Sequence, residues 1–157
     1  MFEHVVTLRT VEEVDETILL HLFFNSSPDL QSMPIPDDIK NVLVRQQFLA
    51  EQHFLKTHFP DADVCVISLN GHIIGRLNMH RGQKAYRILA MALLPEFRNR
   101  GIGRKLLEDI LQEAANCKKK VCLQVAWHNG SARALYEQLG FKVVEDKGVY
   151  YEMQWTP

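Results

Sequence analysis

The sequence predicts a mixed α/β fold in a single domain of residues 1–157, with about seven strands and four helices. Three observations support this prediction. Helical periodicity dominates the first third of the chain, strand patterns with tight-turn signals follow, and helices then alternate with strands. No repeat, low-complexity tract or linker interrupts these patterns. A chain of this length buries roughly 70% of its unfolded surface, which suits one domain with its own core.

The N-terminal third is expected to hold one strand and two helices. Phe2–Leu8 is apolar enough for a short strand. Thr10 and Glu13 have the spacing of a capping box, which predicts a helix from there through about Phe24. Prolines with Ser and Asp residues predict a loop over Asn25–Pro36. A second helix is expected over Asp37–His58, because its apolar residues keep helical spacing.

A group of strands follows these helices. Asn70-Gly71 is a strong hairpin signal, because both residues tolerate positive φ, and it joins strands expected at Val64–Leu69 and His72–His80. Tyr86–Leu94 is nearly continuous in apolar side chains, as in a central strand covered on both faces.

The C-terminal part alternates helices and strands. Apolar residues recur every four positions in the helix predicted at Gly101–Ala115. Asn129 is a typical N-cap residue, and Gly140 is typical of the residue that ends a helix. The remaining elements are a strand at Lys120–Ala126, a helix at Ser131–Leu139, and strands at Phe141–Glu145 and Val149–Trp155.

Composition narrows the class of function. A net charge of −1 argues against a nucleic-acid partner held by bulk electrostatics. No segment approaches the roughly 20 apolar residues of a membrane span, and the acidic N-terminus does not resemble a signal peptide. Cys65, Cys117 and Cys122 show no metal-ligand spacing, and their odd number is typical of reduced thiols in a cytoplasmic protein. We therefore expect a cytoplasmic protein without a metal site.

The turn between the strand at Tyr86–Leu94 and the next helix has the composition of an anion site. Pro95 ends the strand, and Gly101 and Gly103 allow a ligand to approach the main chain without a Cβ in the way. The N-terminus of a helix attracts phosphate, and arginines surround it here. The spacing alone also fits a turn with arginines in solvent. A dinucleotide or P-loop site fits worse, because neither G-x-G-x-x-G nor G-x-x-x-x-G-K-[ST] is present.

Two blocks of this sequence resemble the GNAT superfamily of N-acetyltransferases. The first is Arg98-x-x-Gly101-x-Gly103, which resembles the superfamily's acyl-CoA pyrophosphate loop. The second is Asn129-x-x-Ala132-x-x-Leu135-Tyr136-x-x-x-Gly140-Phe141, which looks like its downstream signature. The order of elements is also similar over nearly the whole chain. The resemblance implies a mixed, mostly antiparallel sheet flanked by helices, with acetyl-CoA as cosubstrate.

The resemblance also implies roles for particular residues. Main-chain groups at the end of the central strand would pair with pantetheine. The segment Arg98–Arg104, called the glycine-arginine loop below, would bind the pyrophosphate. Asn129 would bind the pantetheine arm, and Tyr136 would protonate the departing thiolate as general acid. The expected cofactor-binding residues are Met91, Ala92, Leu93, Arg98, Asn99, Arg100, Gly101, Ile102, Gly103, Arg104, Asn129, Ala132 and Tyr136. Plain capping by Asn129 and plain packing of Tyr136 are the alternatives.

The sequence departs from the family pattern at the general base. Many relatives place a glutamate in the central strand, whereas Tyr86–Leu94 contains no carboxylate. His128 and His80 are candidate bases, and a water relay or an amine of low pKa is the alternative. The acceptor, a small-molecule or peptide amine, is expected against the first two helices. The sequence does not decide whether the protein forms a homodimer through the last hairpin. It also leaves a different function as an alternative, a non-catalytic acyl-CoA sensor that regulates a protein partner.

Overall fold

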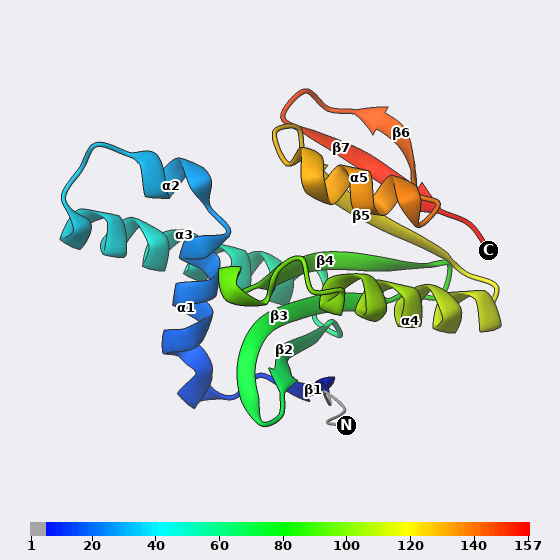
Figure 1. The fold of residues 1–157 in the computed structure, drawn as a ribbon, viewed down its shortest axis with the longest axis horizontal. Helices are drawn as coiled ribbons and strands as arrows, with labels where there is room; N and C mark the ends of the chain where they lie inside the picture. Colours follow the sequence, from blue (N-terminus) through cyan, green and yellow to red (C-terminus); the bar gives the residue numbers. More distant parts are fainter. Residues whose placement is uncertain (1–5) are drawn as a thin grey trace. The chain divides into compact units, whose positions relative to one another are not determined.

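The computed structural model describes residues 6–157, which contain seven strands and five α-helices (Figure 1). Two short 3-10 helices, η1 and η2, precede α1 and α4. In chain order the elements are β1 (Val6–Thr10), η1 (Glu13–Asp15), α1 (Glu16–Asn25), α2 (Pro28–Ser32), α3 (Asp37–His58), β2 (Asp63–Leu69), β3 (His72–Arg81), β4 (Ala85–Leu93), η2 (Pro95–Phe97), α4 (Ile102–Asn116), β5 (Lys120–Ala126), α5 (Gly130–Gln138), β6 (Lys142–Asp146) and β7 (Tyr150–Trp155).

The strands form one mixed, mostly antiparallel sheet in the order β1-β2-β3-β4-β5-β7-β6. β1 pairs antiparallel with β2, and β7 pairs antiparallel with both β5 and β6. β4 and β5 run parallel, and their paired residues extend from Ala85 and Lys120 to Ile88 and Leu123. Main-chain groups of β4 beyond Ile88 lie outside this ladder. The expected fold class is therefore confirmed.

The predicted elements are confirmed with boundary shifts of one or two residues, and two predictions near the N-terminus are wrong. Thr10 does not start a helix, because its main chain pairs with Cys65 at the end of β1. The capping box is formed instead by Glu12 and Asp15 at η1. The expected loop at 25–36 contains the short helix α2, which Pro28 begins. Of the strand predicted at 2–8, residues 2–5 lie outside the described part.

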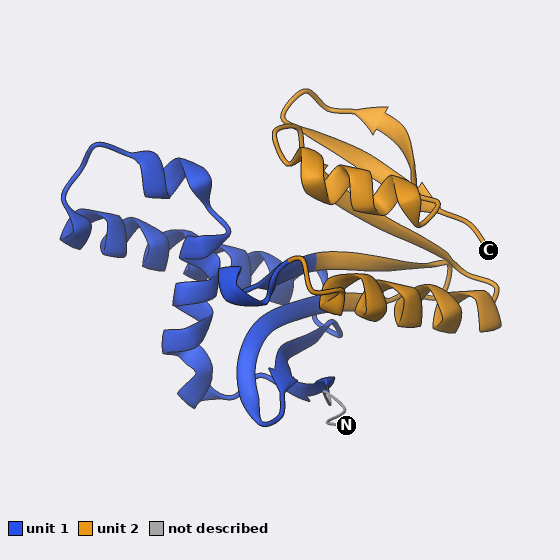
Figure 2. Cartoon of the chain, viewed as in Figure 1, with its two compact units in different colours: residues 1–78, 90–98 blue, residues 79–89, 99–157 orange. Residues whose placement is uncertain are grey.

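The chain divides into two compact units, residues 1–78 with 90–98 and residues 79–89 with 99–157 (Figure 2). In the first unit, α1 and α3 pack their apolar faces together with β2. Leu19 and Leu22 of α1 contact Phe48 and Val66 in a buried cluster. Arg76 is also buried here, donates two hydrogen bonds to Glu51 at 2.8 and 3.2 Å, and lies over the Phe23 ring. The buried charge is thus paired, as burial requires.

In the second unit, α4 packs on β5. The buried residues of α4 recur at the spacing of one helix face, and β5 buries Val121, Leu123 and Val125. Phe141 and Met153 are fully buried as well. This core holds α4 and its N-terminal end in a defined position within the unit.

Asp15 completes the capping box at the N-terminal end of η1. It is only 3% exposed, and its carboxylate accepts hydrogen bonds from the Arg9 guanidinium at 3.0 Å and from the Glu12 amide at 2.8 Å. The Arg9 hydrogen bonds, followed by that of Glu12, hold the pKa of Asp15 below its ordinary value. Because the folded-state pKa is lowered, this carboxylate stabilises the fold above its unfolded pKa, and the contribution is lost as pH falls through the folded-state value.

Replacing Asp15 with asparagine is therefore expected to lower Tm by a few degrees at pH 7. The difference from the unmodified protein should shrink below pH of about 4, where the unfolded carboxyl takes up its proton. Thermal unfolding followed by circular dichroism between pH 3 and 7 checks this, with the exposed Asp29→Asn as control. An equal loss of stability at every pH would contradict the assignment.

Candidate cofactor-binding and catalytic site

The loop before α4 is shaped by two residues in the left-handed region. Asn99 has φ of 60° and Gly101 has φ of 81°. Gly101 is the N-cap of α4 and carries no side chain to bond the helix end. Lys105 donates to the Gly101 carbonyl, so the amides of Ile102, Gly103 and Arg104 precede the first intrahelical bond. A bound anion would accept hydrogen bonds from these amides.

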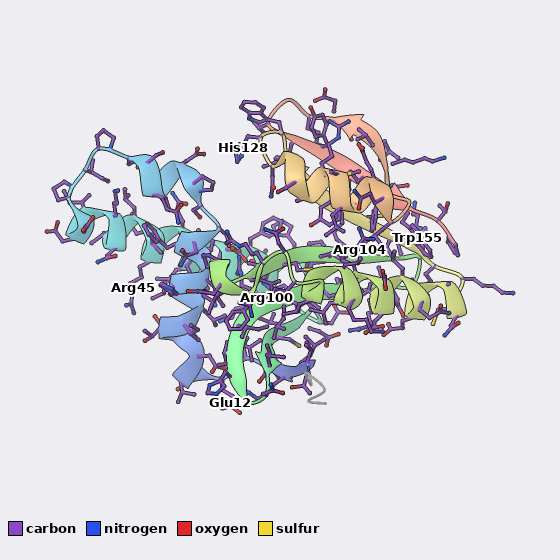
Figure 3. The ribbon with its side chains drawn as sticks, in the orientation of Figure 1. Glu12, Arg45, Arg100, Arg104, His128 and Trp155 are labelled. Atoms are coloured by element: carbon purple, nitrogen blue, oxygen red, sulfur yellow. The ribbon has the colours of Figure 1, made fainter. Side chains whose placement is uncertain are left out.

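The surroundings of this helix end favour an anion. The first turn of α4 contains no acidic residue, and a Cβ placed on Gly101 would meet no atom within 4 Å. Arg100 and Arg104 are labelled in Figure 3, and Arg104 donates a hydrogen bond to Gln138 at the end of α5. Positive helix dipole, open main chain and basic side chains thus coincide, and they fit a pyrophosphate.

Arg98 also belongs to this loop, but its side chain is engaged elsewhere. Its Nε donates to the Leu93 carbonyl at 3.0 Å and its Nη2 to the Asn25 carbonyl at 3.2 Å. Leu93 ends β4 and Asn25 ends α1. The sequence pattern shows no sign of the Asn25 contact, because the two residues are 73 positions apart.

Met91, Ala92 and Leu93, the predicted pantetheine strand, are half-buried at the end of β4. They lie in the first unit, opposite Gly75 of β3. The Ala92 carbonyl oxygen and the Leu93 side chain occupy the space that a Cβ of residue 75 would need. Glycine at this position therefore allows the close approach of β3 to the end of β4.

Asn129 is the N-cap of α5, and Tyr136 lies on this helix, both in the second unit. The Asn129 side chain accepts a hydrogen bond from the Ala132 amide at 3.3 Å, so its predicted capping role is confirmed. Tyr136 is half-buried, and its ring centre lies 5.7 Å from that of Phe141. Burial raises the pKa of the Tyr136 hydroxyl above its ordinary value. At neutral pH this hydroxyl therefore carries its proton.

The candidate bases differ in exposure. His128 is exposed and lies two residues before α5, where Figure 3 labels it. Its ring is edge-on to that of Trp127, with 5.6 Å between the ring centres. His80 is half-buried in β3.

The described residues contain no group of three His, Cys, Asp or Glu placed to hold a metal ion. In the same part of the chain, no helix has the length and apolar character needed to cross a bilayer.

A family comparison agrees with this geometry. The model of the acetyltransferase (GNAT) domain matches residues 60–143, more than half of the chain. The protein belongs to the GNAT acetyltransferase family. The GNAT match includes the glycine-arginine loop, Asn129 and Tyr136, and it leaves out α1, α2 and α3. The helices expected to contact the acceptor are thus outside the matched region.

Individual relatives of this GNAT protein support the fold. N-alpha-acetyltransferase 50 of Danio rerio is 31% identical over 84 residues, and the alignment covers 52% of this chain and 50% of that protein. The chain thus matches about half the length of this curated relative. PaiA N-acetyltransferase from Thermoplasma acidophilum, solved with coenzyme A, is 18% identical with a TM-score of 0.72, covering 98% and 99% of the two chains. The ribosomal-protein-S18-alanine N-acetyltransferase from Escherichia coli is 18% identical with a TM-score of 0.65, covering 97% and 94%.

Proposed function

We propose that this protein transfers an acetyl group from acetyl-CoA to a primary amine, by direct attack in a ternary complex. The observation that supports this most is the open, basic N-terminal end of α4, within the region that matches the GNAT domain. The PaiA enzyme, which shares the fold, was solved with coenzyme A. The amine is a small molecule or a peptide, and a homodimer stays a prediction.

The cofactor contacts divide among three segments. Main-chain amides of Asn99–Arg104, together with the Arg100 and Arg104 side chains, bind the pyrophosphate. Main-chain groups of Met91–Leu93 pair with the pantetheine arm as an added strand would. At the start of α5, Asn129 and Ala132 contact the same arm, and Asn129 also keeps its capping hydrogen bond.

The reaction forms a C–N bond and breaks a C–S bond. The amine lone pair attacks the thioester carbonyl carbon, and the tetrahedral intermediate expels the CoA thiolate. Tyr136 gives its proton to that thiolate. The proton lost by the attacking nitrogen leaves through water or a base and balances the transfer, so the products are an amide and free CoA. An acyl-cysteine is disfavoured at Cys122, because burial raises the pKa of its thiol.

The amine's own pKa decides how much the protein needs a base. At pH 7, deprotonating a lysine-like amine costs about 4.6 kcal/mol, whereas an α-amine costs about 1.4 kcal/mol. β4 supplies no carboxylate. We therefore propose that the acceptor is an amine of low pKa or loses its proton to a water relay, with His128 as the alternative base.

Calorimetry with acetyl-CoA tests the cofactor site. The unmodified protein should bind it, and Gly101→Ala should weaken binding about tenfold, because alanine at positive φ costs about 1–2 kcal/mol. Gly148→Ala is the matched control: its φ is 85° and, as at Gly101, a Cβ there would meet no atom within 4 Å. The control should lose comparable stability but keep its affinity. If the unmodified protein binds neither acetyl-CoA nor CoA, the proposal fails.

A second candidate function is an acyl-CoA sensor that acts through a protein partner. The lack of a carboxylate in β4 favours it. Incubation with acetyl-CoA and a panel of amines, including peptides with a free N-terminus, separates the two functions. Release of the CoA thiol supports the transferase. Acetyl-CoA binding without thiol release on any amine would favour the sensor.

A further inference from the structure

Arg98 begins the glycine-arginine loop, but its guanidinium joins two other parts of the first unit. Its Nε donates to Leu93 at the end of β4, at 3.0 Å, and its Nη2 donates to Asn25 at the end of α1, at 3.2 Å. Its main-chain amide donates to the Pro95 carbonyl at 3.3 Å. Two of the three guanidinium nitrogens thus donate hydrogen bonds to main-chain carbonyl oxygens.

Both contacts are favourable for physical reasons. The last carbonyls of a helix have no intrahelical partner, and a cation there also complements the negative end of the helix dipole. The Leu93 carbonyl lies at the end of a strand, beyond the ladder that β4 forms with β5. A hydrogen bond from a charged donor is stronger than one from a neutral group, so the guanidinium restrains both carbonyls.

We propose that Arg98 is a positioning residue, which holds the end of β4 for the pantetheine arm and the end of α1 for the acceptor, and does not bind phosphate through its guanidinium. The proposal rests on the proposed function, in which Met91–Leu93 pair with pantetheine. A phosphate ligand and a positioning residue make different predictions, because only the second acts on the pantetheine half of the cofactor.

Two ligands separate these roles. Acetyl-CoA contains both halves of the cofactor, whereas 3′-phospho-ADP contains the nucleotide and its phosphates without pantetheine. In calorimetry, the affinity of Arg98→Met for acetyl-CoA should be about tenfold lower than that of the unmodified protein. Its affinity for 3′-phospho-ADP should stay within about twofold of the unmodified value. Arg100→Met, the matched control within the loop, should weaken both ligands by similar factors.

A glutamine at position 98 separates the two hydrogen bonds. Its Nε2 is as many bonds from Cα as the arginine Nε, so it can still donate to Leu93, but it has no atom to reach Asn25. Arg98→Gln should therefore keep most of the affinity for acetyl-CoA. In hydrogen exchange, the last turn of α1 should exchange faster in both Arg98 variants, and the end of β4 faster only in Arg98→Met.

The outcomes distinguish this proposal from the proposed function. If Arg98→Met weakens both ligands equally, or neither, the positioning role is overturned while acetyl-CoA binding by the unmodified protein still stands. The same holds if Arg98→Gln behaves as Arg98→Met does. If the unmodified protein does not bind acetyl-CoA, the proposed function fails and this role fails with it. Binding of 3′-phospho-ADP shows at the same time that each variant is folded.

Discussion

Replacing Gly75 with alanine is expected to destabilise the protein by about 3 kcal/mol, the upper end of what overpacking usually costs. The added methyl group would overlap the Ala92 carbonyl oxygen and lie 2.8 Å from Leu93 Cδ2 and 3.1 Å from Ile67 Cδ1. Ile67 is fully buried, and the Ala92 carbonyl is main chain, which cannot rotate away as the end of a side chain can. The end of β4 must therefore shift. Urea denaturation measures the loss.

Gly130→Ala is the matched control for this experiment. Gly130 lies in the first turn of α5, where a Cβ would meet no atom within 4 Å. Alanine there should be neutral or slightly stabilising, because alanine has the higher helix propensity. If Gly75→Ala unfolds at the same urea concentration as the unmodified protein, the close packing of β3 against the end of β4 is wrong.

The second large effect is expected on catalysis. Tyr136→Phe should lower kcat by about 10²-fold or more while acetyl-CoA affinity stays nearly constant, because only the proposed proton donor is removed. Without the donor, the CoA thiolate must leave unprotonated or wait for a proton from solvent. Steady-state kinetics with an amine found in the panel and direct acetyl-CoA binding measure the two quantities separately. Tyr150→Phe removes a hydroxyl from β7 of the same unit and should leave kcat unchanged.

The pH dependence gives a second check on Tyr136. Burial raises the pKa of this hydroxyl above the ordinary tyrosine value of about 10, so the hydroxyl keeps its proton throughout the range from pH 7 to 9. The rate of the proposed acetyl transfer by the unmodified protein should not fall in that range through loss of the Tyr136 proton. An unchanged kcat in Tyr136→Phe would remove the general-acid role, whatever the pH profile.

Much of the fold follows from local patterns that were readable in the sequence. α3 was predicted at the residues it occupies, because a long amphipathic repeat with a proline beyond its end leaves few alternatives. The cap at Asn129 and the hairpin at Asn70-Gly71 likewise depend on neighbours in the chain. Thr10 misled the prediction, because a distant partner, Cys65, holds it in β1.

In the candidate site, too, local motifs were found in the sequence, whereas contacts between distant residues were not. The loop at Arg98–Arg104 and the block at Asn129–Tyr136 were found as motifs, and their cofactor and catalytic roles stay predictions. The partners of Arg98 and the contact of Gly75 with β4 were not foreseen, because they join residues that the chain keeps far apart.

Apart from the start of α1 and the short helix α2, neighbouring residues thus specified the helices, strands and turns, since these depend on interactions within a few positions. Folding decided which carbonyls the Arg98 guanidinium bonds, which glycine must lack a Cβ, and how deeply Tyr136 is buried. Those features depend on packing between distant segments, and no local pattern encodes the distance between two such segments.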